Sequence, residues 1–284
     1  MQEVPKITLH DGSTIPQLGF GTWQLEPADT VTIVSHALEV GYRHIDTAEM
    51  YGNEKEVGLA FKKSELSRED VFITSKLNNN AHEPDQARKA FKATLSALEL
   101  DYIDLFLIHW PLPTRYNGDF VSTWNVLEEF KNDGRARSIG VSNFRIDDLK
   151  KLAESCDSMP VVNQIEAHPF FQNEKLIRYN DSQEIATEAW SPLAQGGELL
   201  ENPEIIAISK ETGKTPAQVV IRWHIQKGYI IFPKSVTPDR IDENFNVFDF
   251  TLSDQAMHQI DSLDKGEPGR TGPNPDIFDM IPKY

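Results

Sequence analysis

Residues 103–111 read IDLFLIHWP, and this run is the most apolar stretch of the 284-residue chain. Asp104 and His109 interrupt it, and it falls far short of the roughly 18 to 20 apolar residues that cross a membrane. It shows little of the polar–apolar alternation of a strand with one wet face, so it is typical of a strand covered on both faces. Such a strand predicts a parallel sheet with helices packed against it.

The predicted strand in this stretch spans 103–109. Seven further β-rich runs flank it, and segments with helical apolar spacing separate them. Many of these segments begin at Asp, Thr or Ser and end at Gly, as helix caps require. The runs span 17–20, 44–46, 71–75, 138–141, 161–165, 184–190 and 229–232, and the clearest helical segments span 29–41, 85–100, 123–134 and 215–228. Eight strand–helix units of about 35 residues each match the size of a βα repeat.

Two α/β architectures accommodate eight such repeats, a doubly wound sheet and a closed (β/α)₈ TIM barrel. The count of eight and the absence of a Pro/Gly/Ser-rich linker favour the barrel, as one domain over residues 1–284. Residues 6–17, KITLHDGSTIPQ, predict an N-terminal β-hairpin with a tight turn at Asp11-Gly12. We expect this hairpin to close the N-terminal end of the barrel.

Composition limits the partners and the compartment. Lys and Arg number 28 against 44 Asp and Glu, a formal net charge of −16. A phosphate backbone or an anionic membrane surface would repel such a chain, so neither nucleic acid nor membrane is an expected partner. The one cysteine, Cys156, cannot form an internal disulfide, and the N-terminus lacks a signal-peptide pattern. These features predict a cytoplasmic protein, and the absence of an exposed heptad or long apolar patch predicts a monomer.

Three familiar motifs fail when their spacing is checked. Residues 19–24, GFGTWQ, carry Gln where a dinucleotide-binding fingerprint needs its third glycine. The segment Gly213-Lys214-Thr215 lacks the first glycine of a P-loop, because position 208 is Ile. The eight histidines show no metal-ligand spacing, so no metal is predicted.

Polar or aromatic side chains end seven of the predicted strands. Because the C-terminal ends of barrel strands share one rim, these side chains are expected to meet there, where barrel enzymes place their active sites. They are Asp46, Lys76, His109 with Trp110, Ser142 with Asn143, Gln164 with Glu166, Trp190 with Ser191, and Lys234 with Ser235.

Four residues near that rim suggest proton-transfer chemistry. A lysine such as Lys76 at the mouth of an apolar barrel needs a counter-charge, which Asp46 can supply. An ammonium beside the Tyr51 phenol would lower the phenol's pKa from about 10 and make Tyr51 a usable proton donor. His109 could donate a hydrogen bond to a substrate oxygen. The simpler alternatives are a structural ion pair for Lys76 and Asp46, and a core imidazole for His109.

Seven motifs, in order along the chain, resemble those of the aldo-keto reductase superfamily. They are GYRHIDTAEMYGNE (41–54), VFITSKL (71–77), DLFLIHWP (104–111), SIGVSNF (138–144), VNQIEAHP (162–169), AWSPLAQG (189–196) and FPKSVTPDRIDEN (232–244). The short loops, together with HIQKG at 224–228, resemble the bacterial 2,5-diketo-D-gluconate reductase-type branch.

The resemblance implies an NADPH-dependent oxidoreductase that reduces the carbonyl group of small polar aldehydes or ketones, such as 2,5-diketo-gluconate or methylglyoxal-like dicarbonyls. Tyr51 would be the general acid, Lys76 and Asp46 its tuning pair, and His109 the residue that orients the carbonyl. An alternative is a catalytically silent NADP(H)-binding accessory subunit. Arg270 in the short tail at 266–284 could attract a substrate carboxylate.

The resemblance also implies which residues bind the NADPH (NADP⁺) cofactor and the substrate. Trp190 would stack on the nicotinamide, and Arg240 would clamp the 2′-phosphate from the N-terminus of a helix. The implied cofactor residues are Gly21, Thr22, Asp46, Ser142, Asn143, Gln164, Trp190, Ser191, Leu193, Lys234, Ser235, Thr237, Arg240, Glu243 and Asn244, and the implied substrate residues are Trp23, Tyr51, His109 and Trp110.

Overall fold

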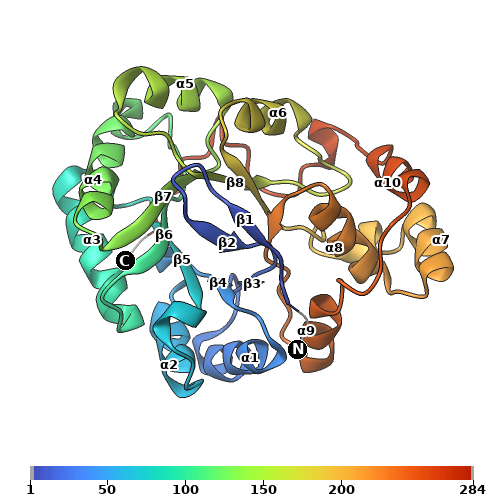
Figure 1. Cartoon of the computed structure of the whole chain (residues 1–284). Helices are drawn as coiled ribbons and strands as arrows, with labels where there is room; N and C mark the ends of the chain where they lie inside the picture. Colours follow the sequence, from blue (N-terminus) through green and yellow to red (C-terminus); the bar gives the residue numbers. More distant parts are fainter. Residues whose placement is uncertain (1–2, 283–284) are drawn as a thin grey trace.

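The computed structural model describes residues 3–282, and in it eight parallel strands form a barrel ringed by helices (Figure 1). The four residues 1–2 and 283–284 of the predicted domain and tail lie outside the described part. The barrel strands are β3 (Phe20–Gly21), β4 (His44–Asp46), β5 (Phe72–Leu77), β6 (Ile103–Ile108), β7 (Ala136–Ser142), β8 (Val162–Glu166), β9 (Ala186–Trp190) and β10 (Ile230–Ile231). The predicted (β/α)₈ barrel is therefore confirmed.

The two edge strands of the sheet meet through the residues before β3. Leu18 forms a parallel bridge with Ile231, the Gly19 N–H donates to the Ile231 oxygen at 2.8 Å, and the Ile231 N–H donates to the Gln17 oxygen at 3.0 Å. The first predicted strand, 17–20, thus divides its partners: its beginning pairs with β10, and Phe20 pairs with β4. This division closes the barrel.

Ten α-helices are present among the described residues. Their bounds are α1 (Pro27–Val40), α2 (Glu54–Lys63), α3 (Pro84–Leu98), α4 (Val121–Asn132), α5 (Ile146–Ser155), α6 (Glu174–Ser182), α7 (Pro203–Thr212), α8 (Pro216–Gln226), α9 (Pro238–Phe245) and α10 (Asp254–Asp261). All four predicted helical segments are confirmed to within about two residues at each end. The helices pack on the barrel through apolar contacts such as Phe91 of α3, whose ring lies 4.6 Å from that of Phe106 in β6.

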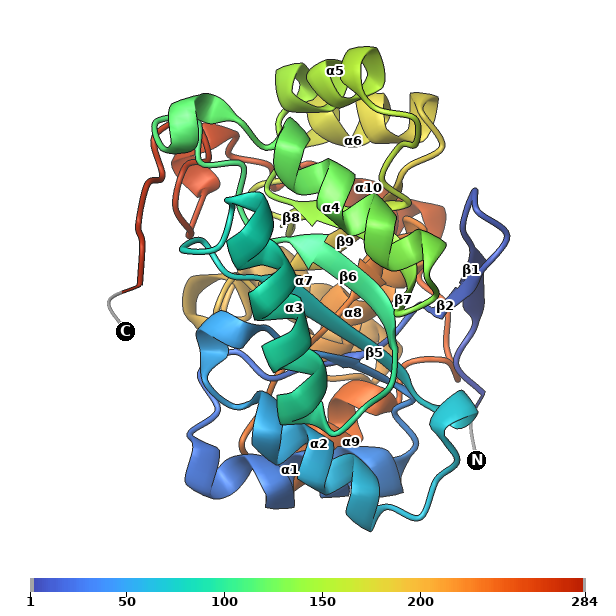
Figure 2. The same ribbon diagram turned by 90° about the vertical axis from the view of Figure 1, so that its left-hand side faces the viewer.

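The predicted N-terminal hairpin is also confirmed, and it covers one end of the barrel (Figures 1 and 2). Strands β1 (Lys6–Thr8) and β2 (Thr14–Pro16) pair antiparallel around the Asp11-Gly12 turn. Leu9 and Ile15 of this hairpin belong to one buried apolar cluster with inward-facing barrel residues, namely Leu105, Leu107, Val162 and Ile230. The N-terminal end of the barrel is closed by this cluster.

The C-terminal tail crosses the opposite end of the barrel (Figure 2) and is anchored by the carboxylate of Glu166, at the end of β8. This carboxylate accepts the Thr271 N–H at 2.5 Å, the Thr271 hydroxyl at 2.7 Å and the Gly272 N–H at 3.1 Å. A Cβ atom at position 272 would lie 2.2 Å from Cη2 of Trp190, so only glycine fits there. The tail therefore lies directly against Trp190.

Candidate active site

A cleft of about 1150 Å³ opens at the C-terminal mouth of the barrel, and most of the predicted site residues line it. The structure thus brings together residues from the C-terminal ends of seven strands, from the loops that follow them and from helix α9. The predicted residues in its wall are Gly21, Trp23, Asp46, Tyr51, His109, Trp110, Ser142, Asn143, Gln164, Trp190, Ser191, Leu193, Lys234, Ser235, Arg240, Glu243 and Asn244.

Three predicted residues do not line the cleft, and each supports a neighbour instead. Lys76 is fully buried behind Asp46. Thr22 is buried as well, and its hydroxyl donates to the Asp46 backbone oxygen at 3.1 Å. Thr237 is exposed before α9, and its N–H donates to the Ser235 hydroxyl at 3.0 Å.

The centre of the site is the ion pair between Lys76 and Asp46, on neighbouring strands β5 and β4. The Lys76 ammonium donates to the two Asp46 carboxylate oxygens at 2.7 and 2.9 Å, to the Thr47 backbone oxygen at 2.9 Å and to the Tyr51 hydroxyl at 3.3 Å. Burial opposes the charge on Lys76, but Asp46 and Tyr51 outweigh burial and raise the pKa of the ammonium. Lys76 is therefore a cation that faces the Tyr51 oxygen.

The direction of the pKa shift at Tyr51 differs from the prediction. Burial raises the pKa of the Tyr51 phenol above its ordinary value of 10.0, and the ammonium of Lys76 offsets only part of that rise. The predicted net lowering is wrong because the cost of burying a phenolate exceeds the benefit of one neighbouring cation. Tyr51 therefore keeps its proton through the physiological pH range, and Lys76 is placed to stabilise the phenolate once the proton has left.

His109 lies beside Tyr51, with the two ring centroids 5.8 Å apart and the planes at 75°. Burial, with a smaller contribution from Lys76, holds the pKa of the imidazole well below 6.5, so His109 is neutral. Its Nδ1 atom is buried and has no hydrogen-bond partner among residues 3–282. A neutral imidazole on the cleft wall can donate one hydrogen bond to a substrate oxygen without carrying a charge.

Asn143 links His109 and Trp190 in the cleft wall. Its side chain donates to the His109 backbone oxygen at 3.0 Å and accepts the indole N–H of Trp190 at 2.9 Å. Its φ of +63° is a left-handed conformation that asparagine tolerates better than most residues. This arrangement fixes the Trp190 ring in the cleft wall, where it offers an aromatic face for stacking.

Two cations in the cleft wall fit a phosphate group. Neither Lys234 nor Arg240 forms a side-chain hydrogen bond or ion pair with any described residue, whereas Glu243 accepts the Thr215 hydroxyl at 2.7 Å. The helix N-terminus itself contributes less than predicted. Pro238 at the first position of α9 has no N–H, and the Arg240 N–H already donates to the Thr237 oxygen at 3.1 Å. The guanidinium and the ammonium are thus the available anion-binding groups, and they fit the 2′-phosphate of NADPH.

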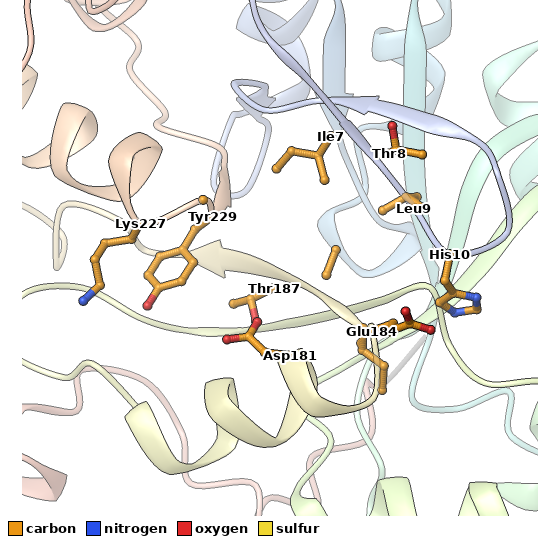
Figure 3. A pocket seen from close by; sticks show the side chains of 12 residues that line it. Ile7, Thr8, Leu9, His10, Asp181, Glu184, Thr187, Lys227 and Tyr229 are labelled. Carbon is orange, nitrogen blue, oxygen red and sulfur yellow. The ribbon is translucent and has the colours of Figure 1, made fainter.

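A second cavity, of about 380 Å³, lies at the opposite end of the barrel (Figure 3). Hairpin residues Ile7 to His10 face the turns before β9 and β10 across it, and none of the predicted site residues lines it. In the part of the chain that the structure describes, no group of three His, Cys, Asp or Glu could hold a metal ion. The helices within residues 3–282 include none with the length and apolar character of a membrane span.

The family comparison agrees with the geometry of the cleft. Residues 17–265 match the family model described as "Aldo/keto reductase family". The chain belongs to this family. Its relatives include an aldo-keto reductase of Mycolicibacterium smegmatis, 50% identical over 97% of this chain and 98% of the relative. The methylglyoxal reductase DkgA of Yersinia pestis is 49% identical over 96% of this chain and 97% of its own.

Solved structures give the same result for this aldo/keto reductase. The crystal structure of an aldo/keto reductase from Brucella melitensis has a TM-score of 0.89 at 47% identity and covers 93% of this chain and 99% of its own. A variant of Gox0644 solved with NADPH has a TM-score of 0.93 at 40% identity, and the match covers 98% of this chain and 99% of that one. Family membership makes the chain an NADPH-dependent oxidoreductase that reduces carbonyl groups, and it does not support the silent accessory subunit.

The sequence points to the tail from Gly266 to Tyr284 as a candidate part of the substrate site of this aldo/keto reductase, but it does not single out several residues that line the cleft. Phe278 of the tail packs on Trp110 with ring centroids 4.1 Å apart, and Met50 and Met280 complete that wall. Arg270, by contrast, is bound to Glu267 through two contacts of 2.9 Å. Arg270 also does not line the cleft, so the structure gives no support to its attracting a substrate carboxylate, and that role stays a prediction.

Proposed function

We propose that this aldo/keto reductase acts on small, uncharged dicarbonyls of the methylglyoxal type, with Tyr51 as the proton donor. The observation that carries this proposal is the character of the cleft wall beside Tyr51, which consists of the uncharged side chains Trp23, Met50, His109, Trp110, Phe278 and Met280. Among the described residues of the cleft, the cations are Lys234 and Arg240, which we assign to the cofactor. A diketo acid would thus gain no ion pair near its reacting carbonyl. Relatives named methylglyoxal reductase support the same substrate class.

The residues of the chain take the following parts in the reaction. NADPH, when bound, supplies the hydride for the carbonyl carbon. Tyr51 gives its hydroxyl proton to the carbonyl oxygen, and Lys76, 3.3 Å away, stabilises the phenolate that remains. Asp46 keeps Lys76 charged and in place, and neutral His109 orients the carbonyl by a hydrogen bond. Ser142, Asn143 and Gln164 would hold the carboxamide of the nicotinamide, and Trp190 would stack on its ring.

A substrate panel with NADPH tests this proposal. We expect kcat/KM for methylglyoxal, followed by the loss of NADPH absorbance, to exceed the values for 2,5-diketo-gluconate and for steroid ketones. The anionic diketo acid lacks a cation to bind beside Tyr51, and we expect the short loop between β6 and α4 to be unable to build a long apolar tunnel for a steroid. A higher kcat/KM for either competitor would contradict the substrate class.

Replacing Arg240 with Ala tests the assignment of the 2′-phosphate. We expect the variant to weaken NADPH binding by at least about tenfold, roughly 1.4 kcal/mol, and to change NADH binding little, because NADH lacks this phosphate. Binding of both cofactors to both proteins is measured by fluorescence titration. Arg178→Ala is the matched control, since Arg178 is exposed and pairs with Glu174 on α6. Equal weakening of NADPH and NADH would show that Arg240 does not contact this phosphate.

Trp190→Ala tests the stacking position. NADPH is expected to quench the intrinsic tryptophan fluorescence of the wild-type protein, and the variant is expected to lose most of that quench. Trp124 is buried in the core and provides the control Trp124→Phe, which should keep the NADPH-induced quench. A full quench in Trp190→Ala would assign the effect to another indole.

We further propose that the protein works as a single domain and as a monomer in the cytoplasm, without a metal ion and without a nucleic-acid partner. The net charge of −16 supports the last point, because it disfavours contact with phosphate backbones. Light scattering coupled to gel filtration measures the oligomeric state, and a dimer mass would contradict the monomer.

A further inference from the structure

Glu188 is a buried carboxyl group that the reaction described above does not use. It lies within β9, with Gln164 of β8 and Ile230 of β10 as its neighbours in the sheet, and its side chain is fully buried. Its Oε2 atom accepts a hydrogen bond from Nε2 of Gln164 at 2.8 Å. Its Oε1 atom has no hydrogen-bond partner within residues 3–282. A buried acid with one unpaired oxygen is costly, so its presence under an active site needs an explanation.

The side-chain amide of Gln164 explains what Glu188 does. Nε2 of Gln164 donates both to Glu188 and to Oδ2 of Asp46, at 2.9 Å. Both amide hydrogens are thus used by carboxyl groups from β9 and β4. With the opposite orientation, the amide oxygen would face the Asp46 carboxylate and be repelled. The side-chain oxygen of Gln164, Oε1, therefore has no hydrogen-bond partner among the described residues. This side chain lines the cleft.

The charge on Glu188 is set by the groups that face it. These are Asp46 from β4, Lys76 from β5 and the neutral amide of Gln164 from β8, while β10 presents the apolar Ile230. Burial, together with Asp46, raises the pKa of Glu188 to about 8, and the Gln164 hydrogen bond and Lys76 offset part of this rise. Asp46 and Lys76 cancel as a pair. The charge beneath the cleft floor therefore changes from about zero to negative when Glu188 loses its proton.

We propose that Glu188 is a positioning residue, which holds the Gln164 amide with its oxygen toward the nicotinamide carboxamide and makes the choice between NADP⁺ and NADPH depend on pH. This inference rests on the proposed place of the nicotinamide beside Gln164. An anionic Glu188 attracts the positively charged oxidised ring and has no such effect on the neutral reduced ring. By linkage, binding of NADP⁺ favours release of the Glu188 proton.

The experiment compares Kd for NADP⁺ with Kd for NADPH between about pH 6.5 and pH 9.5. Both cofactors carry the same phosphates, so the ratio of the two constants cancels the titration of those groups. In the wild-type protein the ratio Kd(NADP⁺)/Kd(NADPH) is expected to fall by about threefold or more as pH rises. In Glu188→Gln the ratio should stay flat while NADPH affinity is kept, because glutamine still accepts the bond from Gln164. In Glu188→Leu the ratio should be flat and both cofactors should bind more weakly.

Glu54 provides a matched control. It is another buried carboxyl group, its pKa is raised to about 7 by burial, and it bonds to Ser75 and Thr94 outside the cleft wall. Glu54→Gln should keep the wild-type pH dependence, which separates Glu188 from buried acids in general. A wild-type slope in Glu188→Gln would overturn the proposal, even if Glu188→Leu fails to fold.

One further variant separates this inference from the proposed function. Gln164→Leu should weaken the binding of both cofactors, and unchanged affinity would remove the nicotinamide from Gln164 and overturn the inference. Neither titration needs turnover, so a failure of methylglyoxal reduction would leave these binding results readable on their own.

Discussion

Tyr51→Phe is expected to lower kcat at least about 100-fold while the Kd for NADPH stays nearly unchanged. The substitution removes the hydroxyl that we propose as the proton donor and keeps the ring, whose centroid lies 4.9 Å from the Lys76 ammonium. Because burial raises the pKa of this phenol, the wild-type kcat for reduction should stay level as pH rises through the physiological range and fall only above it. Steady-state kinetics against pH, combined with a cofactor titration, measure both effects.

Tyr102→Phe is the control for this experiment. The Tyr102 hydroxyl is buried and has no hydrogen-bond partner among the described residues, and the ring packs against the Arg68 guanidinium outside the cleft. Removing that hydroxyl should leave kcat unchanged. A Tyr51→Phe enzyme with near-normal turnover would show that the proton comes from another group.

Lys76→Met is expected to reduce the free energy of unfolding by about 3 kcal/mol or more and to abolish most activity. Lys76 is fully buried and Asp46 is 5% exposed, so methionine would leave a buried carboxylate without its counter-charge. The Tyr51 phenolate would lose its stabilising cation at the same time. Urea unfolding gives the stability change, and kcat for the folded fraction gives the loss of activity.

The double variant Asp46→Asn/Lys76→Met separates charge from packing. It removes both charges, so it should recover more than half of the stability that Lys76→Met loses and remain inactive. If the double variant is as unstable as the single one, the loss comes from the packing of the lysine stem, and the uncompensated charge is not its cause.

The sequence predicts strands well where both faces are covered, and poorly where the partners change. The run at 103–109 matches β6 (Ile103–Ile108) because an uninterrupted apolar run marks a strand covered on both faces. The run at 17–20 differs from β3 (Phe20–Gly21), since pairing with both β10 and β4 is a property of barrel closure. The predicted strand at 184–190 includes Glu184, but this residue has a φ of +56° and lies in the turn before β9.

The sequence likewise predicts some residues of the candidate site and not others. Asp46, Lys76 and His109 could be predicted because polar residues at strand ends meet at one rim of a barrel. Glu188 could not, since the pattern of ATEAW does not show that its glutamate points inward toward the side-chain amide of Gln164. The packing of Phe278 on Trp110 depends on where Glu166 anchors the tail, and no local pattern encodes a contact between such distant segments.

The apolar cluster between the hairpin and the barrel affects where molecules can enter and leave the enzyme, because it lies at the N-terminal end of the barrel. Leu9 and Ile15 are 3% and 0% exposed, and within residues 3–282 they fill the N-terminal end of the barrel together with apolar barrel residues. We therefore expect substrate, product and cofactor all to enter and leave through the cleft at the C-terminal mouth of the barrel. The proton that we propose Tyr51 donates would also have to be replaced from that side, after the product has left. Product release, reprotonation of Tyr51 and binding of the next substrate would then have to occur one after another through this one opening.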